Sequence, residues 1–135
     1  MATTAIELTD AQKELLDEKH YGVVTDINAD GSPHSTVIWV DHDGRHLLFN
    51  TAYGRLKTRN MEREPRVSVI VFDPANPFDR TLTVRGRVEF IDEGADDHID
   101  RLARKYRGVD RYPWRRPDEQ RVTVRVIAEK ISGTV

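Results

Sequence analysis

Apolar and polar positions alternate along several stretches of the chain with the period of two that is typical of β-strands. These stretches are rich in Val, Ile, Thr and Phe, and the first hairpins turn at Asp30-Gly31 and Asp43-Gly44. Gly86 interrupts one stretch and predicts a bulge or bend there. The pattern predicts six strands, over residues 21–27, 34–40, 45–51, 66–73, 81–92 and 121–133.

Other stretches repeat their apolar positions with the helical period and predict helices over residues 9–19, 54–64 and 94–106. Thr9, with Gln12 three residues later, forms the capping-box pattern at the first helix start. Pro65 ends the second helix, because the residue before a proline is pushed out of the α region. The acidic residues that begin the third helix are favoured there by the helix dipole.

Short links between successive strands favour an antiparallel, mainly β fold with α-helices, and closure into a barrel would remove exposed strand edges. An open α+β sheet is the alternative. Strands and helices do not alternate as βαβ units, so we do not expect a Rossmann fold. The 135 residues suffice for one domain over 1–135, in which residues 1–19 supply an N-terminal helix that packs on the barrel.

Composition narrows the function classes. Lys plus Arg total 21 against 23 Asp plus Glu, a net charge of −2, which does not indicate a nucleic-acid partner. No apolar stretch is long enough to span a membrane, and the N-terminus lacks the pattern of a secretory signal. The chain has no cysteine, which excludes disulfides and thiolate metal sites and favours a cytoplasmic location.

The clearest chemical signal is a group of cations, Arg55, Lys57 and Arg59, at the start of the second predicted helix. The helix dipole is positive there and disfavours cations. One interpretation is a solvated helix face, since Arg55, Arg59 and Arg63 follow one another at i, i+4 spacing. The other is a phosphate site, in which helix N–H groups and the Arg and Lys side chains bind one anion. The residues alone leave both interpretations open.

Other chemical candidates are weaker. The five histidines are His20, His34, His42, His46 and His98. His42 and His46 flank a turn rather than sharing a helix, so we interpret the histidines as surface or hairpin residues and expect no metal. The chain has no nucleophile motif and no phosphate-binding glycine loop. The segment 112–117, YPWRRP, is interpreted as packing over a pocket or a subunit partner.

Four segments together resemble a known family: DGSPHSTVIWV, LLFNTAYGRLKTRNMEREPRVSV, TLTVRGRVEF and KYRGVDRYPWR. They resemble the pyridoxamine 5′-phosphate oxidase-like flavin proteins, and within them the actinobacterial oxidoreductases that use coenzyme F420, a deazaflavin. The resemblance covers residues 20–132. It implies a split β-barrel of six or so antiparallel strands with two or three helices, assembled as a homodimer with cofactor sites at the interface.

The resemblance also implies where a cofactor binds. Its phosphate is expected at Arg55 and Lys57, and its ring against the strand segment 35–38. Arg80 and Thr81 are expected to reach the cofactor of the other subunit, and the segment 110–115 to flank the pocket mouth. The implied cofactor-binding residues are Ser35, Thr36, Val37, Ile38, Asn50, Thr51, Arg55, Leu56, Lys57, Arg80, Thr81 and Trp114.

The implied activity is reduction of a small organic substrate, in which reduced F420 passes a hydride to an activated C=C or similar bond. The alternatives are an FMN-binding oxidase or reductase of the same fold, and a non-catalytic F420 carrier. The proton that completes the reduction is expected from solvent or from a tyrosine, for which Tyr112 is the candidate. The chain ends at Val135 without the C-terminal Arg-containing motif of true pyridoxamine phosphate oxidases, so we do not expect that activity.

Overall fold

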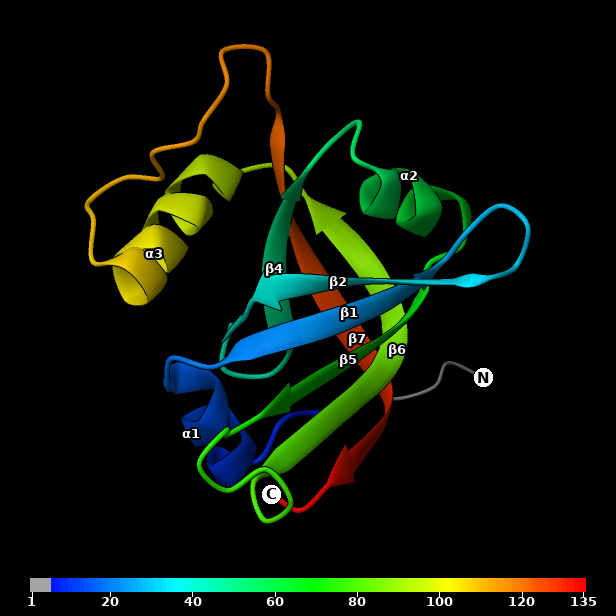
Figure 1. Cartoon of the computed structure of the whole chain (residues 1–135). Helices are drawn as coiled ribbons and strands as arrows, with labels where there is room; N and C mark the ends of the chain where they lie inside the picture. Colours follow the sequence, from blue (N-terminus) through cyan, green and yellow to red (C-terminus); the bar gives the residue numbers. More distant parts are fainter. Residues whose placement is uncertain (1–5) are drawn as a thin grey trace.

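One antiparallel sheet of seven strands dominates the computed structural model, which describes residues 6–135 (Figure 1). Residues 1–5, the beginning of the expected N-terminal segment, lie outside the described residues. The strands are paired in the order β2-β1-β5-β6-β7-β4-β3. Their bounds are β1 (Tyr21–Ile27), β2 (Pro33–Trp39), β3 (Asp41–His42), β4 (Leu47–Ala52), β5 (Arg66–Phe72), β6 (Thr81–Ile91) and β7 (Arg121–Gly133).

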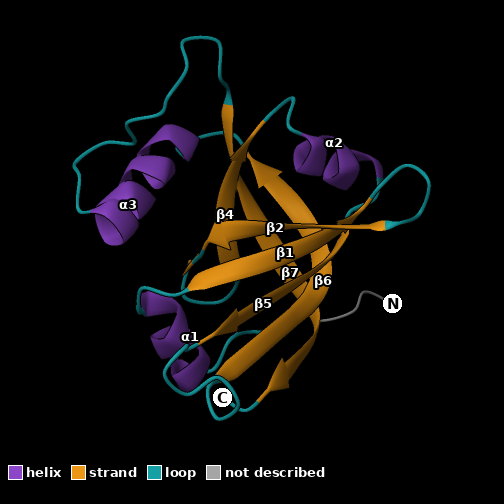
Figure 2. Ribbon diagram, viewed as in Figure 1, coloured by secondary structure: helices purple, strands orange, loops and turns teal. Residues whose placement is uncertain are grey.

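The sheet curls on itself, so that the edge strand β2 crosses β4 near the other edge (Figures 1 and 2). Across the described residues, β2 pairs by hydrogen bonds with β1 alone, and β4 pairs with β3 and β7. The barrel is therefore open between β2 and β4. This confirms the predicted split β-barrel rather than an open sheet.

The six predicted strands are present, and the structure adds one that the pattern missed. β3 pairs Asp41 with Leu48 and His42 with Leu47, where the sequence predicted only a turn. The prediction of a turn alone was wrong, because a strand of two residues is too short to show an alternation of apolar and polar positions. The two predicted hairpin turns are confirmed, and Gly31 and Gly44 adopt the positive φ values, 87° and 93°, that such turns require.

Three helices are present: α1 (Asp10–Asp17), α2 (Leu56–Arg63) and α3 (Ala95–Arg107). The Thr9–Gln12 capping box is confirmed in both directions, at 3.2 and 2.9 Å. α2 ends before Pro65, as expected. None of the helices in residues 6–135 is long and apolar enough to cross a membrane.

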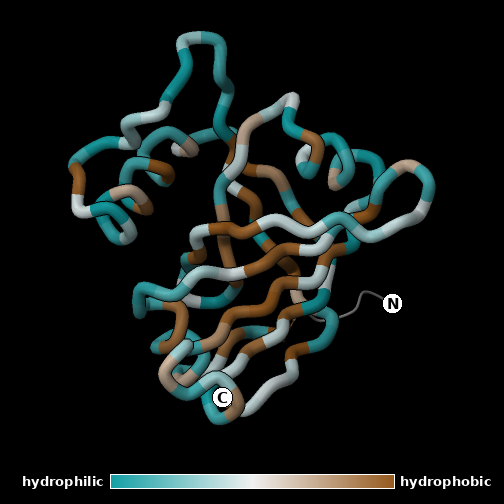
Figure 3. The backbone as a smooth tube through the Cα atoms, viewed as in Figure 1, coloured by the Kyte–Doolittle hydropathy of each residue, from teal (hydrophilic) through white to brown (hydrophobic). Residues whose placement is uncertain are grey.

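The core fills the barrel from the inward-facing positions of the strands, and Figure 3 shows these apolar positions as brown segments along the strands. Val24, Phe49, Val69 and Val124 are completely buried there. α1 packs against the lower end in the view of Figure 1 and buries Leu15 and Leu16 in the same core. α2 and α3 lie at the opposite end, where they leave room for a pocket.

The predicted bulge at Gly86 is confirmed. β6 and β7 pair Arg85 with Lys130 but Gly86 with Ala128, so Glu129 is an extra residue in β7. A Cβ atom at Gly86 would lie 2.0 Å from the carbonyl oxygen of Ile127. The bend that the long strands need to curl the sheet therefore depends on this residue having no side chain.

We expect Gly86→Ala to lower the free energy of unfolding by about 2 kcal/mol or more, because backbone must move to admit the Cβ atom. Gly44→Ala is the matched control, since open space surrounds that residue and only its φ of 93° is strained, at a cost of about 1–2 kcal/mol. Urea unfolding measures both. A smaller loss at Gly86 than at Gly44 would contradict this account of the bulge.

Candidate functional site

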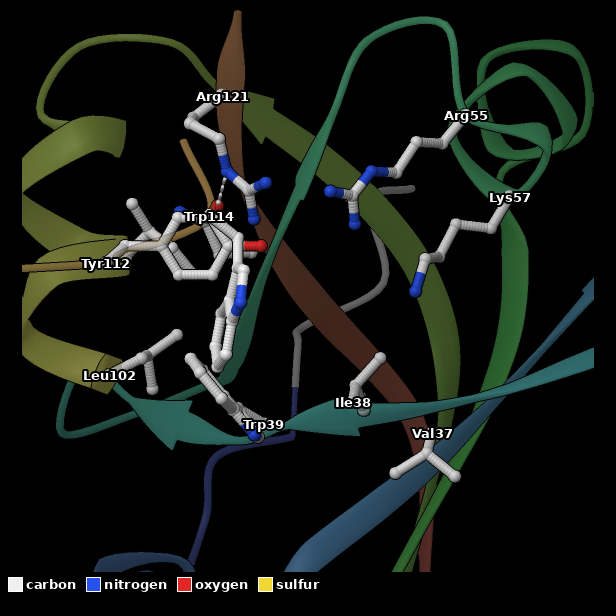
Figure 4. Close-up of a pocket in the computed structure, with 11 residues that line it drawn as sticks. Val37, Ile38, Trp39, Arg55, Lys57, Leu102, Tyr112, Trp114 and Arg121 are labelled. Atoms are coloured by element: carbon white, nitrogen blue, oxygen red, sulfur yellow. Dashed lines mark hydrogen bonds between the residues drawn. The ribbon is translucent and has the colours of Figure 1, made fainter. Parts of the chain in front are cut away.

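A pocket lies where the barrel is open, between β2, the end of β4 and the start of α2. Its remaining side is formed by α3 and by residues 108–120, which connect α3 to β7. The cavity has a volume of about 200 Å³. Figure 4 shows Arg55 and Lys57 entering from one side, with Tyr112 and Trp114 on the opposite side.

Arg55 and Lys57 mark the N-terminus of α2. Arg55 is the N-cap residue, and its side chain makes no capping hydrogen bond to the described backbone. It donates instead to Glu119 at 3.1 Å, while Lys57 Nζ donates to Thr36 Oγ1 at 3.1 Å. The first N–H groups of α2 thus lack a side-chain acceptor, which leaves this helix end suited to an anionic ligand.

Lys57 is a partly buried cation whose one side-chain hydrogen bond within residues 6–135 goes to a hydroxyl. Burial, reinforced by the Arg55 guanidinium, lowers the pKa of Lys57 to about 8. The buried carboxylate of Asp26 acts in the opposite direction, but its hydrogen bonds go to His34 and Asn60. A desolvated ammonium in this position gains strongly from an anion placed against it.

Arg121 adds a third cation and is 4% exposed. Its Nε donates to Asn50 Oδ1 at 2.9 Å, its Nη1 donates to Glu119 Oε1 at 2.9 Å, and its guanidinium lies 5.0 Å from the Tyr112 ring centre. Glu119 Oε1 also accepts from Arg55, so two guanidiniums share one carboxylate. With Lys57 included, three cations face one anion, and this end of the pocket is positive.

Aromatic rings form the opposite wall. The Tyr112 ring meets Trp39 edge-on at 6.2 Å and Trp114 edge-on at 5.6 Å. Asp100 of α3 holds this segment by accepting from the Tyr112 backbone N–H at 2.9 Å and from Arg115 at 2.7 Å. Ile99 and Leu102 of α3 complete the wall. A mostly apolar, aromatic wall beside a cationic end suits a planar ring that carries a negative group.

Behind the pocket, a chain of buried polar groups connects Asn50 to the protein surface. Asn50 Nδ2 donates to the Ala95 carbonyl at 3.0 Å and lies 3.1 Å from His98 Nδ1. Thr123 Oγ1 lies 3.2 Å from the same nitrogen. His98 Nε2 lies 3.2 Å from the Asp41 carboxylate, which also accepts from Arg101 at 2.7 Å.

The interpretation of all histidines as surface or hairpin residues is wrong for His98, which is 5% exposed. His98 precedes Leu102 and Tyr106 by four and eight residues, so it lies on the buried face of α3. That spacing was present in the sequence. It was missed because the histidines were compared only with each other, as metal ligands.

Arg80 and Thr81 lie at the end of β6 that is remote from the pocket (Figure 1). Arg80 Nη1 contacts Glu18 and Asp73, each at 2.7 Å. Glu18, His20 and Asp73 are also the one set of metal-ligand side chains that meet within the described chain. Hydrogen bonds from Arg80 and then His20 lower the pKa of Glu18 to about 2. The guanidinium already binds both carboxylates within one chain, and the predicted contact of Arg80 and Thr81 across a dimer interface stays a prediction.

The structure brings together most of the residues predicted near the cofactor. The predicted residues that line the pocket are Val37, Ile38, Asn50, Arg55, Lys57, Tyr112 and Trp114. Thr36 borders it through its contact with Lys57. Ser35 instead contacts Thr25 at 2.9 Å. Thr51 is buried against Thr58, and the Leu56 side chain is exposed.

The pocket also contains residues that the sequence interpretation missed, namely Trp39, Ile99, Leu102 and Arg121. Trp39 belonged to a predicted strand and the two apolar residues to a predicted helix face, but nothing local shows that they meet. Arg121 begins the last strand directly before the apolar run Val122-Thr123-Val124. The sequence signal that could have identified Arg121 is an arginine at the start of a buried strand.

The open β-barrel thus carries a pocket with a cationic end and an aromatic wall, which suits a planar anionic molecule. The chain belongs to the pyridoxamine 5′-phosphate oxidase family, whose pattern matches residues 8–134. A solved structure described as an F420 reductase has 30% sequence identity and a TM-score of 0.77, over 93% of this chain and 98% of that chain.

Two further relatives are similar to this chain. An F420H(2)-dependent biliverdin reductase of Mycobacterium tuberculosis is 28% identical over 139 residues, which cover 99% of this chain and 93% of that protein. A pyridoxine/pyridoxamine 5′-phosphate oxidase of Aeromonas hydrophila is 37% identical over 68 residues, covering 50% of this chain and 31% of that protein. The predicted family and its oxidoreductase class are confirmed.

The lowered pKa of Lys57 predicts a pH-dependent anion site. Below about pH 8 Lys57 is protonated and binds anions, whereas its neutral form above that pH does not. We therefore expect the affinity for sulfate, whose charge stays constant, to fall by up to about tenfold per pH unit as the pH rises through 8. Chemical-shift titration at several pH values measures this.

Lys57→Arg is the matched control, because a guanidinium stays charged over the same range. Its sulfate affinity is expected to be flat up to about pH 10. An equally steep fall in both proteins would show that a group other than Lys57 titrates.

Proposed function

We propose that the protein is an F420-dependent reductase that transfers a hydride from the reduced deazaflavin to an activated C=C or similar bond of a small organic substrate. The observation that carries this proposal is the pairing of Arg55 and Lys57 at the uncapped start of α2, beside a pocket with one aromatic wall. The F420 named in two relatives supports the choice of cofactor.

The charge balance of the pocket fits a phosphate-bearing cofactor. Three cations meet one carboxylate, and Lys57 is bound by a hydroxyl alone among the described residues. A phosphate near Arg55 and Lys57 would complete this arrangement with charge-assisted hydrogen bonds. The same anion would accept from the first N–H groups of α2. Lys57, which burial desolvates, would gain most from such an anion.

The open edge of β2 supports the expected location of the ring. Because β2 pairs on one side only within the described residues, backbone groups of the segment 35–38 are available to the polar edge of a planar heterocycle. Ile38 offers apolar contact to one face of such a ring, and the exposed Val37 lines the pocket edge. Tyr112 and Trp114 close the pocket mouth and limit the access of water.

The chemistry divides between cofactor and protein. F420 supplies a hydride when it is reduced, and the protein binds, orients and shields the reactants. Tyr112, the candidate proton donor, lines the pocket beneath the Arg121 guanidinium.

We further propose that the chain forms one domain and acts in the cytoplasm as a homodimer of the kind found in the actinobacterial proteins. Large apolar side chains remain exposed on the outer face of β1, β2 and β5, including Tyr21, Val37, Ile70 and Phe72. A second copy placed there would cover this surface and add its own residues to the pocket mouth.

A second candidate is an FMN-dependent oxidase or reductase. It is favoured by the match to a pyridoxine/pyridoxamine 5′-phosphate oxidase over half of this chain. FMN also carries a planar ring and a phosphate, so it would use the same cationic end of the pocket. A non-catalytic F420 carrier would bind in the same way but would turn over no acceptor.

Fluorescence titration with F420, beside an FMN titration, distinguishes the cofactors, and we expect binding of F420 at micromolar or lower concentration. Oxidation of reduced F420 should then be followed with a panel of conjugated acceptors that includes biliverdin, the substrate named for one relative. Binding of FMN alone would favour the second candidate. Tight binding of F420 with no turnover on the whole panel would favour the carrier.

Arg55→Ala and Lys57→Ala are each expected to weaken F420 binding by about 1.5–3 kcal/mol, the range of a charge-assisted hydrogen bond. Arg59→Ala is the matched control, because Arg59 lies on the exposed side of the same helix and does not line the pocket. Isothermal titration of the three variants measures the difference. Equal losses of affinity in all three variants would indicate that the helix attracts the cofactor only through its overall positive charge.

A further inference from the structure

The orientation of Arg121 depends on an amide that could adopt two positions. Arg121 Nε donates to Asn50 Oδ1, and this bond requires that the Asn50 oxygen face the guanidinium. A rotation of the amide by half a turn would place its NH₂ group against the guanidinium, donor against donor. Something must hold the amide in the first position.

The backbone carbonyl of Ala95 supplies one part of that constraint, and the other part comes from His98. Its Nδ1 accepts from Asn50 Nδ2 and from Thr123 Oγ1, which is consistent only with a proton on Nε2. The Nε2–H then donates to the Asp41 carboxylate at 3.2 Å. Burial opposes the charge on Asp41, but hydrogen bonds from His98 and Arg101 outweigh it and hold the pKa of that carboxyl below its usual range.

The connected groups come from four different elements: Asp41 from β3, His98 from α3, Asn50 from β4 and Arg121 from β7. All but Asp41 are at least nine-tenths buried. Two protons of the Asn50 amide go to Ala95 and His98, so the amide has no donor left for a ligand. Its use in the pocket is therefore to hold Arg121.

We propose that His98, fixed by Asp41, is a positioning residue that locks the Asn50 amide and keeps Arg121 turned into the pocket to bind an anionic oxygen of the ligand. The proposal deepens the proposed function, since it concerns the same pocket. Arg121 Nε and Nη1 are engaged by Asn50 and Glu119, and Nη2 makes no protein hydrogen bond within the described residues. Nη2 is therefore the donor that remains for the anion when Asn50 and His98 hold Arg121 in this orientation.

Two substitutions at one position separate positioning from stability. His98→Leu fills the buried site with a residue of higher helix propensity but removes the acceptor for Asn50. His98→Asn has lower helix propensity but places an amide oxygen where Nδ1 accepts. If His98 contributed only to packing, His98→Leu would be the more stable variant and would bind the ligand no worse than His98→Asn. If His98 positions Arg121, His98→Asn would bind the ligand more tightly.

The first readout is the Nε–H resonance of Arg121 in the protein without ligand, assigned by its loss in Arg121→Lys. We expect a slowly exchanging signal in the wild type and in His98→Asn, and a shifted or broadened one in His98→Leu. An unchanged signal in a folded His98→Leu protein would overturn the proposal. This readout needs no cofactor, so it stays decisive if F420 does not bind.

The second readout is affinity for sulfate and for F420. We expect His98→Leu to lose about tenfold or more and His98→Asn to stay within about threefold of the wild type. If the affinity falls for both sulfate and F420, Arg121 binds an anion at the end of the pocket where sulfate binds. If the affinity falls for F420 alone, Arg121 binds another oxygen of the cofactor. Equal affinities of the two variants for both probes would contradict the proposal.

The third readout applies once an acceptor is found. Asp41→Leu removes the group that fixes the His98 tautomer, while Asp41→Asn retains an amide oxygen that accepts from Nε2. We expect Asp41→Leu to lower kcat/KM about tenfold and Asp41→Asn to restore most of it. Failure of the Asn variant to restore activity, with the Arg121 signal intact, would show that Asp41 acts through something other than His98.

Discussion

A β-barrel that does not close must cover or use its two free edges, and in this protein the pocket is built on that opening. β2 and β4 lie against each other without pairing, so the wall between them consists of backbone edges and of side chains from α2, α3 and the segment 108–120. The bulge at Gly86 curls the sheet far enough for the edges to approach. α2 and the residue before it bring Lys57 and Arg55 to this gap, whereas β4 and β7 bring Asn50 and Arg121.

The placement of charge follows from the same geometry. Arg121 opens β7 and Arg55 precedes α2, and the two reach the gap from opposite sides (Figure 4). Their mutual repulsion is relieved by Glu119, which binds both. Glu119 cannot also neutralise Lys57, whose burial lowers its pKa. The protein therefore keeps one unbalanced cation at a helix N-terminus, an arrangement that is costly when empty and favourable when an anion is bound.

Local sequence signals predicted the fold and the cationic half of the pocket well. The strand period, the Asp-Gly turns and the capping box act between near neighbours, and Arg55 and Lys57 stand two residues apart. The other half depends on contacts between distant residues. Arg121 meets Asn50, 71 positions away, and His98 meets Asp41, 57 positions away. No pattern in a short stretch of sequence predicts such a contact, because it arises from how β7 and α3 pack against β4.

The two halves of the pocket therefore differ in how easily they can change while the fold is kept. Arg55 and Lys57 belong to one strand–helix junction, so their placement is preserved whenever that junction folds. The aromatic wall lies on the segment 108–120, which is tied to α3 mainly through Asp100. Replacing Tyr112 or Trp114 would reshape the space for a substrate without disturbing the barrel core, because neither belongs to it. Arg121 lies between the two halves, and the buried Asn50–His98 contact fixes it to the rigid part. An anionic group held there is therefore positioned by the fold, while the rest of the ligand is selected by the segment.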